Sequence, residues 1–212
     1  MPTPPNARSV KISDDERGGW SSDRPRRGNA PERPADVSVR GRVLRPSDTL
    51  RYSPGSLLVV VSPSAEERDK LIARVVEKQS DVFGLDKVRA LVAGRVPADQ
   101  EEERAAQLLD AAVEKRLEAG ETVLLAASSL DPAERERYVR MAHRFKRPRH
   151  LILLEVARDQ VDDDDRGALN DLRRRLDAGE LGAEGFQTSL RLGGSSIGEL
   201  KRIVFRPPPQ DD

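Results

Sequence analysis

The sequence has 212 residues, 36% of them hydrophobic, and its 37 Lys and Arg are balanced by 37 Asp and Glu. This length fits one globular domain plus a tail, and the zero net charge argues against a basic protein that holds nucleic acid nonspecifically. The absence of cysteine excludes disulfides, thiol catalysis and thiolate metal sites. The two histidines, His143 and His150, are too few and too isolated for a metal cluster, so we expect no bound metal.

The sequence contains no candidate membrane segment. No run approaches the roughly 18 apolar residues that a membrane span needs, and the N-terminus has no apolar signal core. We therefore expect a cytoplasmic protein without a membrane contact.

Residues 1–52 are rich in Pro, Gly, Ser and Arg, as in MPTPPNAR and RPRRGNAPERP, and have no sustained apolar period. Such a segment buries too little surface to offset its ordering entropy, so we predict a disordered tail, and also a disordered C-terminus at 208–212. Up to Arg51 the tail carries 11 Lys and Arg against 7 Asp and Glu, which makes it the basic part of the chain. It either contacts a polyanion weakly or is a solvated leader with no partner. Trp20 is either the anchor of a short linear motif or an incidental aromatic residue.

Short continuous apolar runs begin after the tail, at 56–61, 122–127 and 150–156. Runs without a polar face are typical of strands that are buried on both sides of a parallel sheet. Helical patterns separate these runs, so the sequence predicts βαβ units and a three-layer α/β domain over residues 53–207. The predicted centre of the sheet contains Val59, Val60, Leu124, Leu125, Ile152 and Leu153.

Three segments carry helix signals. Ser64 with Glu67 has the S-x-x-E spacing of a capping box, and Asp131 precedes Pro132 and Glu134 in a similar arrangement. An apolar stripe at i, i+3 and i+4 spacing predicts a third helix that ends near Gly120; it consists of Ala105, Leu108, Leu109, Ala112, Val113 and Leu117.

The order of these elements and three stretches of sequence resemble the P-loop kinase domain of the bacterial polynucleotide kinase group, an AAA-type ATPase/kinase domain. The stretches are LDKVRALVAG, AAVEKRLEAGETVLLAASSLDPAERERYVRMAHRF and GALNDLRRRLDAGELGAEGFQTSLRL, and the resemblance covers about residues 57–192. It implies a P-loop kinase-like fold that would bind ATP and magnesium and phosphorylate a 5′-hydroxyl.

The nucleotide motifs of that family are replaced in this chain. A Walker A loop reads G-x-x-x-x-G-K-[ST], because glycines let N–H groups surround the phosphates, the lysine neutralises them and the hydroxyl binds magnesium. Those four positions are Ser62, Glu67, Arg68 and Asp69 here, with Ser64 between them. Glu66 and Glu67 would also repel a triphosphate. We therefore expect a degenerate loop that binds no nucleotide, with Ser64 and Glu67 capping the helix instead.

Two further family motifs are changed. The segment Asp-Ala-Thr-Asn appears as AASS (126–129), which places Ala126 at the position of the carboxylate, and the arginine-bearing lid reads ARDQVDDDDRG, with four aspartates between Arg158 and Arg166. Four adjacent carboxylates oppose anion binding and otherwise indicate a solvated loop.

One motif is retained. LDKVR keeps the Asp-x-x-Arg spacing, so the resemblance assigns Asp86 to the general base for the acceptor 5′-hydroxyl and Arg89 to the acceptor phosphate. A spacing of three places both side chains on one helix face. The alternative is that Asp86 is a helix N-cap and the two residues form a surface ion pair.

Three functions are compatible with these observations. The first is a catalytically inactive kinase-like domain, a pseudoenzyme that works as an interaction or scaffold protein for an unknown protein partner and needs no cofactor. The second is a non-catalytic binder of nucleic-acid 5′ ends that uses Arg89 and the basic tail. The third is a divergent ATP-dependent polynucleotide 5′-hydroxyl kinase that uses magnesium, with Arg68 in place of the lysine.

Overall fold

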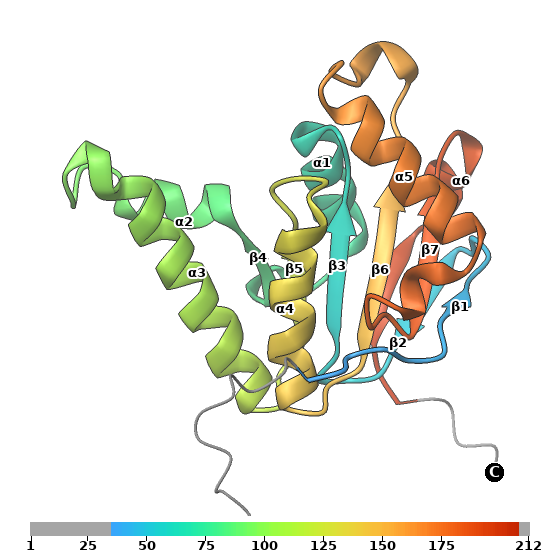
Figure 1. The fold of residues 1–212 in the computed structure, drawn as a ribbon, viewed down its shortest axis with the longest axis horizontal. Helices are drawn as coiled ribbons and strands as arrows, with labels where there is room; N and C mark the ends of the chain where they lie inside the picture. Colours follow the sequence, from blue (N-terminus) through green and yellow to red (C-terminus); the bar gives the residue numbers. More distant parts are fainter. Residues whose placement is uncertain (1–34, 208–212) are drawn as a thin grey trace, which may run out of the picture. The chain divides into compact units, whose positions relative to one another are not determined.

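The computed structural model describes residues 35–207, which form a parallel sheet with helices on both faces (Figure 1). Six strands are arranged in the order β1-β7-β6-β3-β5-β4, and all neighbouring pairs are parallel. Strands β2 and β8 pair in parallel as a second, two-stranded sheet. The strands are β1 (Arg42–Val43), β2 (Thr49–Tyr52), β3 (Leu57–Val61), β4 (Val82–Gly84), β5 (Val123–Ala126), β6 (Arg149–Leu154), β7 (Thr188–Leu192) and β8 (Arg202–Phe205).

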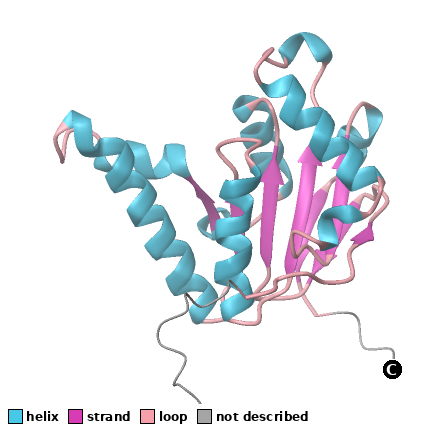
Figure 2. Cartoon of the chain, in the orientation of Figure 1, coloured by secondary structure: helices cyan, strands magenta, loops and turns pink. Residues whose placement is uncertain are grey.

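Different elements cover the two faces of the large sheet (Figure 2). Helices α3, α4 and α5 pack over the face that includes Leu57 and Val59, whereas α1 and the β2–β8 sheet pack over the face that includes Leu58 and Val60. Successive side chains of a strand point to opposite faces, so strands covered on both sides need the continuous apolar runs seen in the sequence. The predicted three-layer α/β class is confirmed. The helices are α1 (Ala65–Val75), α2 (Leu85–Val92), α3 (Glu101–Glu118), α4 (Pro132–Arg144), α5 (Asp165–Asp177) and α6 (Ser195–Glu199), with short 3₁₀ turns η1 (Gln79–Asp81), η2 (Ala98–Gln100), η3 (Arg158–Gln160) and η4 (Glu180–Gly182).

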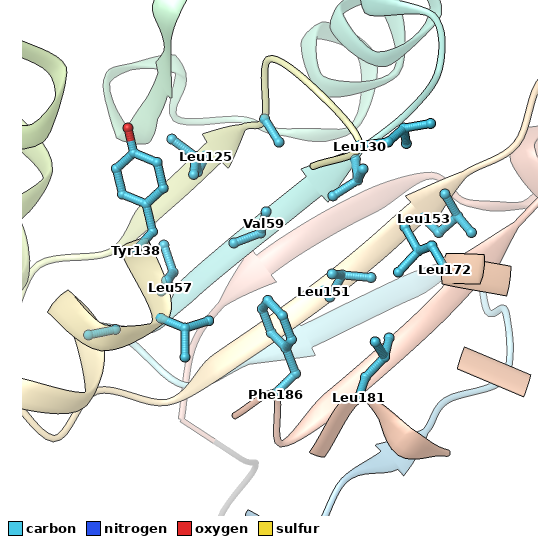
Figure 3. Close-up of a cluster of buried hydrophobic side chains, with 14 of the residues drawn as sticks. Leu57, Val59, Leu125, Leu130, Tyr138, Leu151, Leu153, Leu172, Leu181 and Phe186 are labelled. Atoms are coloured by element: carbon cyan, nitrogen blue, oxygen red, sulfur yellow. The ribbon is translucent and has the colours of Figure 1, made fainter. Parts of the chain in front are cut away.

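The core lies where the sequence places it. Each of the six residues predicted at the centre of the sheet is at most 1% exposed. Figure 3 shows the α3–α5 side of this core, where Tyr138 and Phe186 pack with Val59, Leu125 and Leu151. Burial of this apolar surface is the main source of stability for the domain.

Four of the six residues in the predicted apolar stripe on α3 are buried, and Ala112 is half-buried. Ala105, Leu109, Val113 and Leu117 are buried, but Leu108 is 38% exposed. The helix is followed by Gly120 in the left-handed conformation (φ 76°), as its position after the stripe predicts.

The predicted tail boundary at residue 52 is wrong, because residues 35–52 belong to the folded unit. Strand β1 pairs with β7, strand β2 pairs with β8, and Val37, Leu50 and Tyr52 are buried. These strands are short and pair with segments far along the chain, so local hydrophobic periodicity does not reveal them. The predictions for residues 1–34, including Trp20, and for 208–212 lie outside the described residues.

The glycine-rich segment 191–199 connects two strands. It contains the end of β7 and the short helix α6, and leads to β8. Among the helices of residues 35–207, none has the length and apolarity that a membrane crossing requires.

Candidate functional site

The candidate site lies at the edge of the sheet where β3, β5 and β6 end and where α1 begins (Figure 1). In open α/β sheets, ligands bind outside the carboxyl ends of the strands, in the loops that follow them. Three loops meet at this edge: residues 62–64 after β3, residues 127–131 after β5, and a lid loop, residues 155–164, after β6.

The loop after β3 is stabilised by its own side chains. Ser64 is the N-cap of α1, and its hydroxyl accepts a hydrogen bond from the Glu67 N–H at 3.3 Å. The Ser64 N–H donates in turn to the Ser62 hydroxyl at 3.2 Å. The carboxylate of Glu67 does not return to Ser64, since it accepts from Lys70 Nζ at 2.9 Å instead. Half of the predicted capping box is therefore present.

Arg68 lies inside the site and is only 3% exposed. Its Nε donates to the Asp69 carboxylate at 2.8 Å, and its Nη1 donates to the carbonyl oxygen of Ala127, the first residue after β5. Its Nη2 is 3.9 Å from the nearer carboxylate oxygen of Asp86. A buried guanidinium must have such partners because an unpaired charge away from water is costly. The arginine at the lysine position of the P-loop pattern therefore links α1 to the end of β5.

Asp86 and Arg89 lie on one face of α2, as their spacing predicts. The Arg89 Nη1 donates to Asp86 at 2.5 Å, while its Nε and Nη2 donate to the two carboxylate oxygens of Glu102 on α3, both at 2.6 Å. The hydrogen bonds to Glu102 and then to Asp86 raise the pKa of Arg89, and Arg89 in turn lowers the pKa of Glu102. The interpretation of Asp86 as an N-cap is wrong, because Gly84 has that position.

These residues form one chain of charges across three helices. It runs from Arg68 and Asp69 on α1, through Asp86 and Arg89 on α2, to Glu102 on α3. The sequence identified the first four residues but not Glu102, which lies 13 positions after Arg89 and contacts it only because α2 and α3 pack together. No local spacing rule predicts such a contact.

The turn after β5 is occupied by a carboxylate from α4. Glu134 accepts hydrogen bonds from the N–H and hydroxyl of Ser128, at 2.8 and 2.9 Å, and from the N–H and hydroxyl of Ser129, both at 2.9 Å. Asp131 is the N-cap of α4, as predicted, since it accepts from the Ala133 N–H at 2.9 Å. The expected return of Glu134 to Asp131 does not occur, because the serine turn offers it four donors.

The lid loop carries both signs of charge. Arg166 is paired with Asp163, and Arg173 on α5 donates to Glu155 at 2.5 Å. Arg158, Arg166 and Arg173 line a cavity of about 380 Å³ whose apolar wall includes Val161 and Leu169. Two of these three arginines therefore already contact carboxylates of the protein.

A larger cavity of about 460 Å³ lies between α1, the end of β6 and α6. Its charged side chains have partners in the protein. Lys70 pairs with Glu66 and Glu67, Arg74 donates to the carbonyl oxygens of Ile197 and Leu200, and Glu155 pairs with Arg173 and Arg191. Within residues 35–207, no three carboxylate or imidazole groups are placed to hold a metal ion.

The chain is similar to known proteins in its structure and in part of its sequence. Its structure is similar to that of the tunicamycin resistance protein of Deinococcus radiodurans, with 17% identity, a TM-score of 0.38, and coverage of 72% of this chain and 99% of that chain. No curated protein sequence matches it. The AAA domain model AAA_33 matches residues 58–167, just over half of the 212 residues and the part that includes all three loops of the candidate site. The chain therefore belongs to this AAA domain family, whose members have a P-loop kinase-like fold.

Proposed function

We propose that this protein is a catalytically inactive, kinase-like interaction or scaffold domain that does not bind ATP. The observation that carries the proposal is the position of Arg68. A P-loop lysine must extend freely toward the phosphates, but the Arg68 guanidinium is buried and bonded to Asp69 and the Ala127 carbonyl oxygen. A nucleotide would have to break these contacts before its phosphates could pair with the Arg68 guanidinium.

The backbone around the site supports the same proposal. A P-loop binds phosphate through N–H groups that have no partner in the protein. Here the N–H groups of Ser64 and Glu67 are bonded to serine hydroxyls, and those of Ser128 and Ser129 are bonded to Glu134. Carboxylates thus lie where a nucleotide would bring negative charge, and they oppose its binding.

The role as an interaction domain is supported by exposed apolar side chains. Leu91 on α2 is 61% exposed and Leu108 on α3 is 38% exposed, on the pair of helices that extends away from the sheet (Figure 1). Removal of such exposed apolar surface from water by a partner is favourable. We propose that this helix pair contacts the protein partner.

The two alternative functions would each require existing contacts in the protein to break. A binder of 5′ ends would have to free Arg89 from both Glu102 and Asp86 before it could grip a phosphate. A divergent ATP- and magnesium-dependent kinase would also need a new metal ligand, because Asp69 is engaged by Arg68 and the β5 terminus carries Ala126. The observed contacts favour the inactive domain over both.

Calorimetry with millimolar Mg·ATP tests the proposal. We expect no binding heat from the natural protein, and none from Arg68→Lys, because that change supplies a charge without a glycine cradle or a metal ligand. A variant that combines Ser62→Gly, Glu67→Gly, Arg68→Lys and Asp69→Ser restores the four Walker A residues and is the matched comparison for the natural protein. Micromolar Mg·ATP binding by the natural protein would overturn the inactive-kinase proposal.

A further inference from the structure

The β2–β8 sheet has one face on the core and one face that carries arginines. Leu50 on β2 and Ile203 on β8 point into the core, so the residues next to them on each strand point away from it. The outward residues include Arg51 on β2, Arg202 at the start of β8, and Arg206 just after its end. All three are exposed, and we call them the arginine face.

The charge of the arginine face is not neutralised by the described part of the protein. No carboxylate of residues 35–207 lies within ion-pair distance of its three arginines. Asp48, just before β2, and Glu77, beside the bridge to β8, do not reach them. Segments 40–52 and 201–206 together contain seven cationic residues and one acidic residue. Because the whole chain has no net charge, this local excess of cations favours an anionic partner at this face.

Strand β2 also has a free edge. The N–H groups of Arg202 and Arg206 donate to the carbonyl oxygens of Asp48 and Tyr52, at 3.2 and 3.0 Å, so the even-numbered residues of this segment direct their backbone groups toward β8. Successive residues of a strand direct these groups to opposite sides. Arg51 therefore directs its N–H and C=O away from β8, to a side where no strand of residues 35–207 pairs with β2. Such an edge can pair with a further strand.

We propose that an extended peptide segment with carboxylates at alternate positions binds along the free edge of β2. Side chains on one face of a strand repeat about every 6.6 Å, which is twice the rise per residue. Alternate acidic residues of an added strand would therefore all lie on the side of the arginine face, where guanidinium groups donate to carboxylates. The backbone of the segment would bond to the N–H and C=O of Arg51, as in other cases of strand addition to a sheet edge.

Other polyanions match this surface less well. Tyr52 and Phe205, the aromatic residues of these strands, pack against the core and are not available to stack on nucleic-acid bases. The large apolar residues exposed within residues 35–207 are Val43, Leu91 and Leu108, and none of them is on β2 or β8, so these strands offer nothing for insertion into a membrane. Neither partner would complete the backbone edge. The surface goes beyond the proposed function, since it lies on other elements than the α2–α3 pair and requires no nucleotide.

Titration of the full chain with the blocked peptide Ac-ETETETE-amide, followed by amide NMR, tests the proposal. We expect saturable shifts of amides in 49–52, and at saturation at least about tenfold slower hydrogen exchange at the Arg51 N–H. The Leu50 N–H, which faces β8, should change little. The peptide Ac-TEEEETT-amide has the same composition and charge without the alternation, and it should bind at least about tenfold more weakly. Equal affinity of the two peptides, or binding without protection of the Arg51 N–H, would overturn the inference.

Charge reversal locates the binding. Arg51→Glu, and Arg206→Glu beyond the end of β8, should each weaken binding of the alternating peptide at least about tenfold, because each replaces a carboxylate donor by a repelling charge. The matched control is Arg174→Glu on α5, an exposed arginine that pairs with Asp171 at 2.6 Å, and it should leave the affinity unchanged. Unchanged affinity in both Arg51→Glu and Arg206→Glu would refute the site.

Two competing probes test the class of partner. A double-stranded oligonucleotide and phosphatidylserine vesicles should both bind more weakly than the alternating peptide at the same ionic strength. If either binds more tightly and loses its affinity in Arg51→Glu, the arginine face recognises phosphates and the peptide inference fails. ATP calorimetry is a separate measurement, so this inference and the proposed function can fail independently.

Discussion

Arg135 on α4 and Glu184, 49 positions later, form a two-point ion pair in which Nε and Nη2 of the arginine donate to the two carboxylate oxygens at 3.1 and 3.2 Å. Arg135 is 2% exposed, and its Nη1 also donates to the Leu130 carbonyl at 2.7 Å. Arg175 on α5 approaches the same carboxylate at 2.5 Å. Glu184 thus joins α4 and α5. The Glu-Gly-Phe segment before β7, residues 184–186, therefore has a structural role.

We expect Arg135→Ala to lower the free energy of unfolding by about 3 kcal/mol, because it leaves the Glu184 carboxylate with one partner and removes a buried side chain. Denaturant unfolding measures this change. The matched control is Arg137→Ala on the same helix, whose arginine is 44% exposed and pairs with Asp110 at 3.2 Å. Arg137→Ala should lower the free energy of unfolding by less than about 1 kcal/mol. Equal effects of the two substitutions would contradict a special role for the Arg135–Glu184 pair.

Glu134→Ala should free the serine turn after β5. The change removes the acceptor of four hydrogen bonds, so the amide hydrogens of Ser128 and Ser129 should exchange with solvent at least about tenfold faster than in the natural protein. Hydrogen exchange followed by NMR measures both sites. Glu134→Gln keeps one acceptor oxygen and should give an intermediate rate. If exchange at Ser128 and Ser129 does not change, Glu134 does not hold this turn in solution.

Arg89→Ala should affect the α2–α3 pair and not nucleic-acid binding. Arg89 is 42% exposed, so loss of its bonds to Glu102 and Asp86 should cost about 1 kcal/mol or less in unfolding free energy. Affinity for 5′-phosphorylated and 5′-hydroxyl oligonucleotides, measured by fluorescence anisotropy at low salt, should stay the same. A weakening by about 1–3 kcal/mol for 5′-ended strands would instead support the 5′-end binder.

The stability of the protein should depend on pH through His150. Its ring lies 4.5 Å from that of Tyr52, its Nδ1 is 2.8 Å from the Thr188 hydroxyl, and its Nε2 has no partner within residues 35–207. Burial lowers the pKa of His150 from 6.5 to about 4, and the charge of Arg149 contributes in the same direction. Between these values the unfolded chain takes up a proton that the folded protein excludes, so stability is complete above about pH 6.5 and falls as the pH is lowered toward 4.

The expected loss across this window is about 3 kcal/mol. Denaturant unfolding at several pH values, compared between the natural protein and His150→Phe, isolates this contribution because phenylalanine does not titrate. The variant should have a flatter dependence between pH 6.5 and pH 4. Parallel curves would show that His150 is protonated equally easily in the folded and unfolded chains.

The parts of the fold that the sequence predicts well are those with a strong local pattern. Val59, Leu124 and Ile152 lie in apolar runs without a polar side, and such runs are stable only between two covering layers. The N-caps Ser64 and Asp131 are equally local, because each bonds an N–H within three residues.

Several of the errors concern contacts that local spacing rules do not describe. Thr49–Tyr52 form a strand only because β8 is beside them, and Glu134 turns to Ser128 and Ser129 because the turn after β5 presents four donors. The contact of Arg89 with Glu102 depends on how α2 packs against α3. Each of these outcomes follows from tertiary geometry, which a pattern of single residues does not contain.

The pairing of β2 with β8 has a consequence for biosynthesis. Arg202 on β8 donates to the hydroxyl of Thr49 on β2, 153 positions earlier, and β1 likewise needs β7. A ribosome releases these partners at the end of translation of the domain, so residues 42–52 must wait as unpaired strands while β3, β5 and β6 are already synthesised. Folding of the domain is therefore complete only after β7 and β8 have been synthesised, and it depends on long-range contacts.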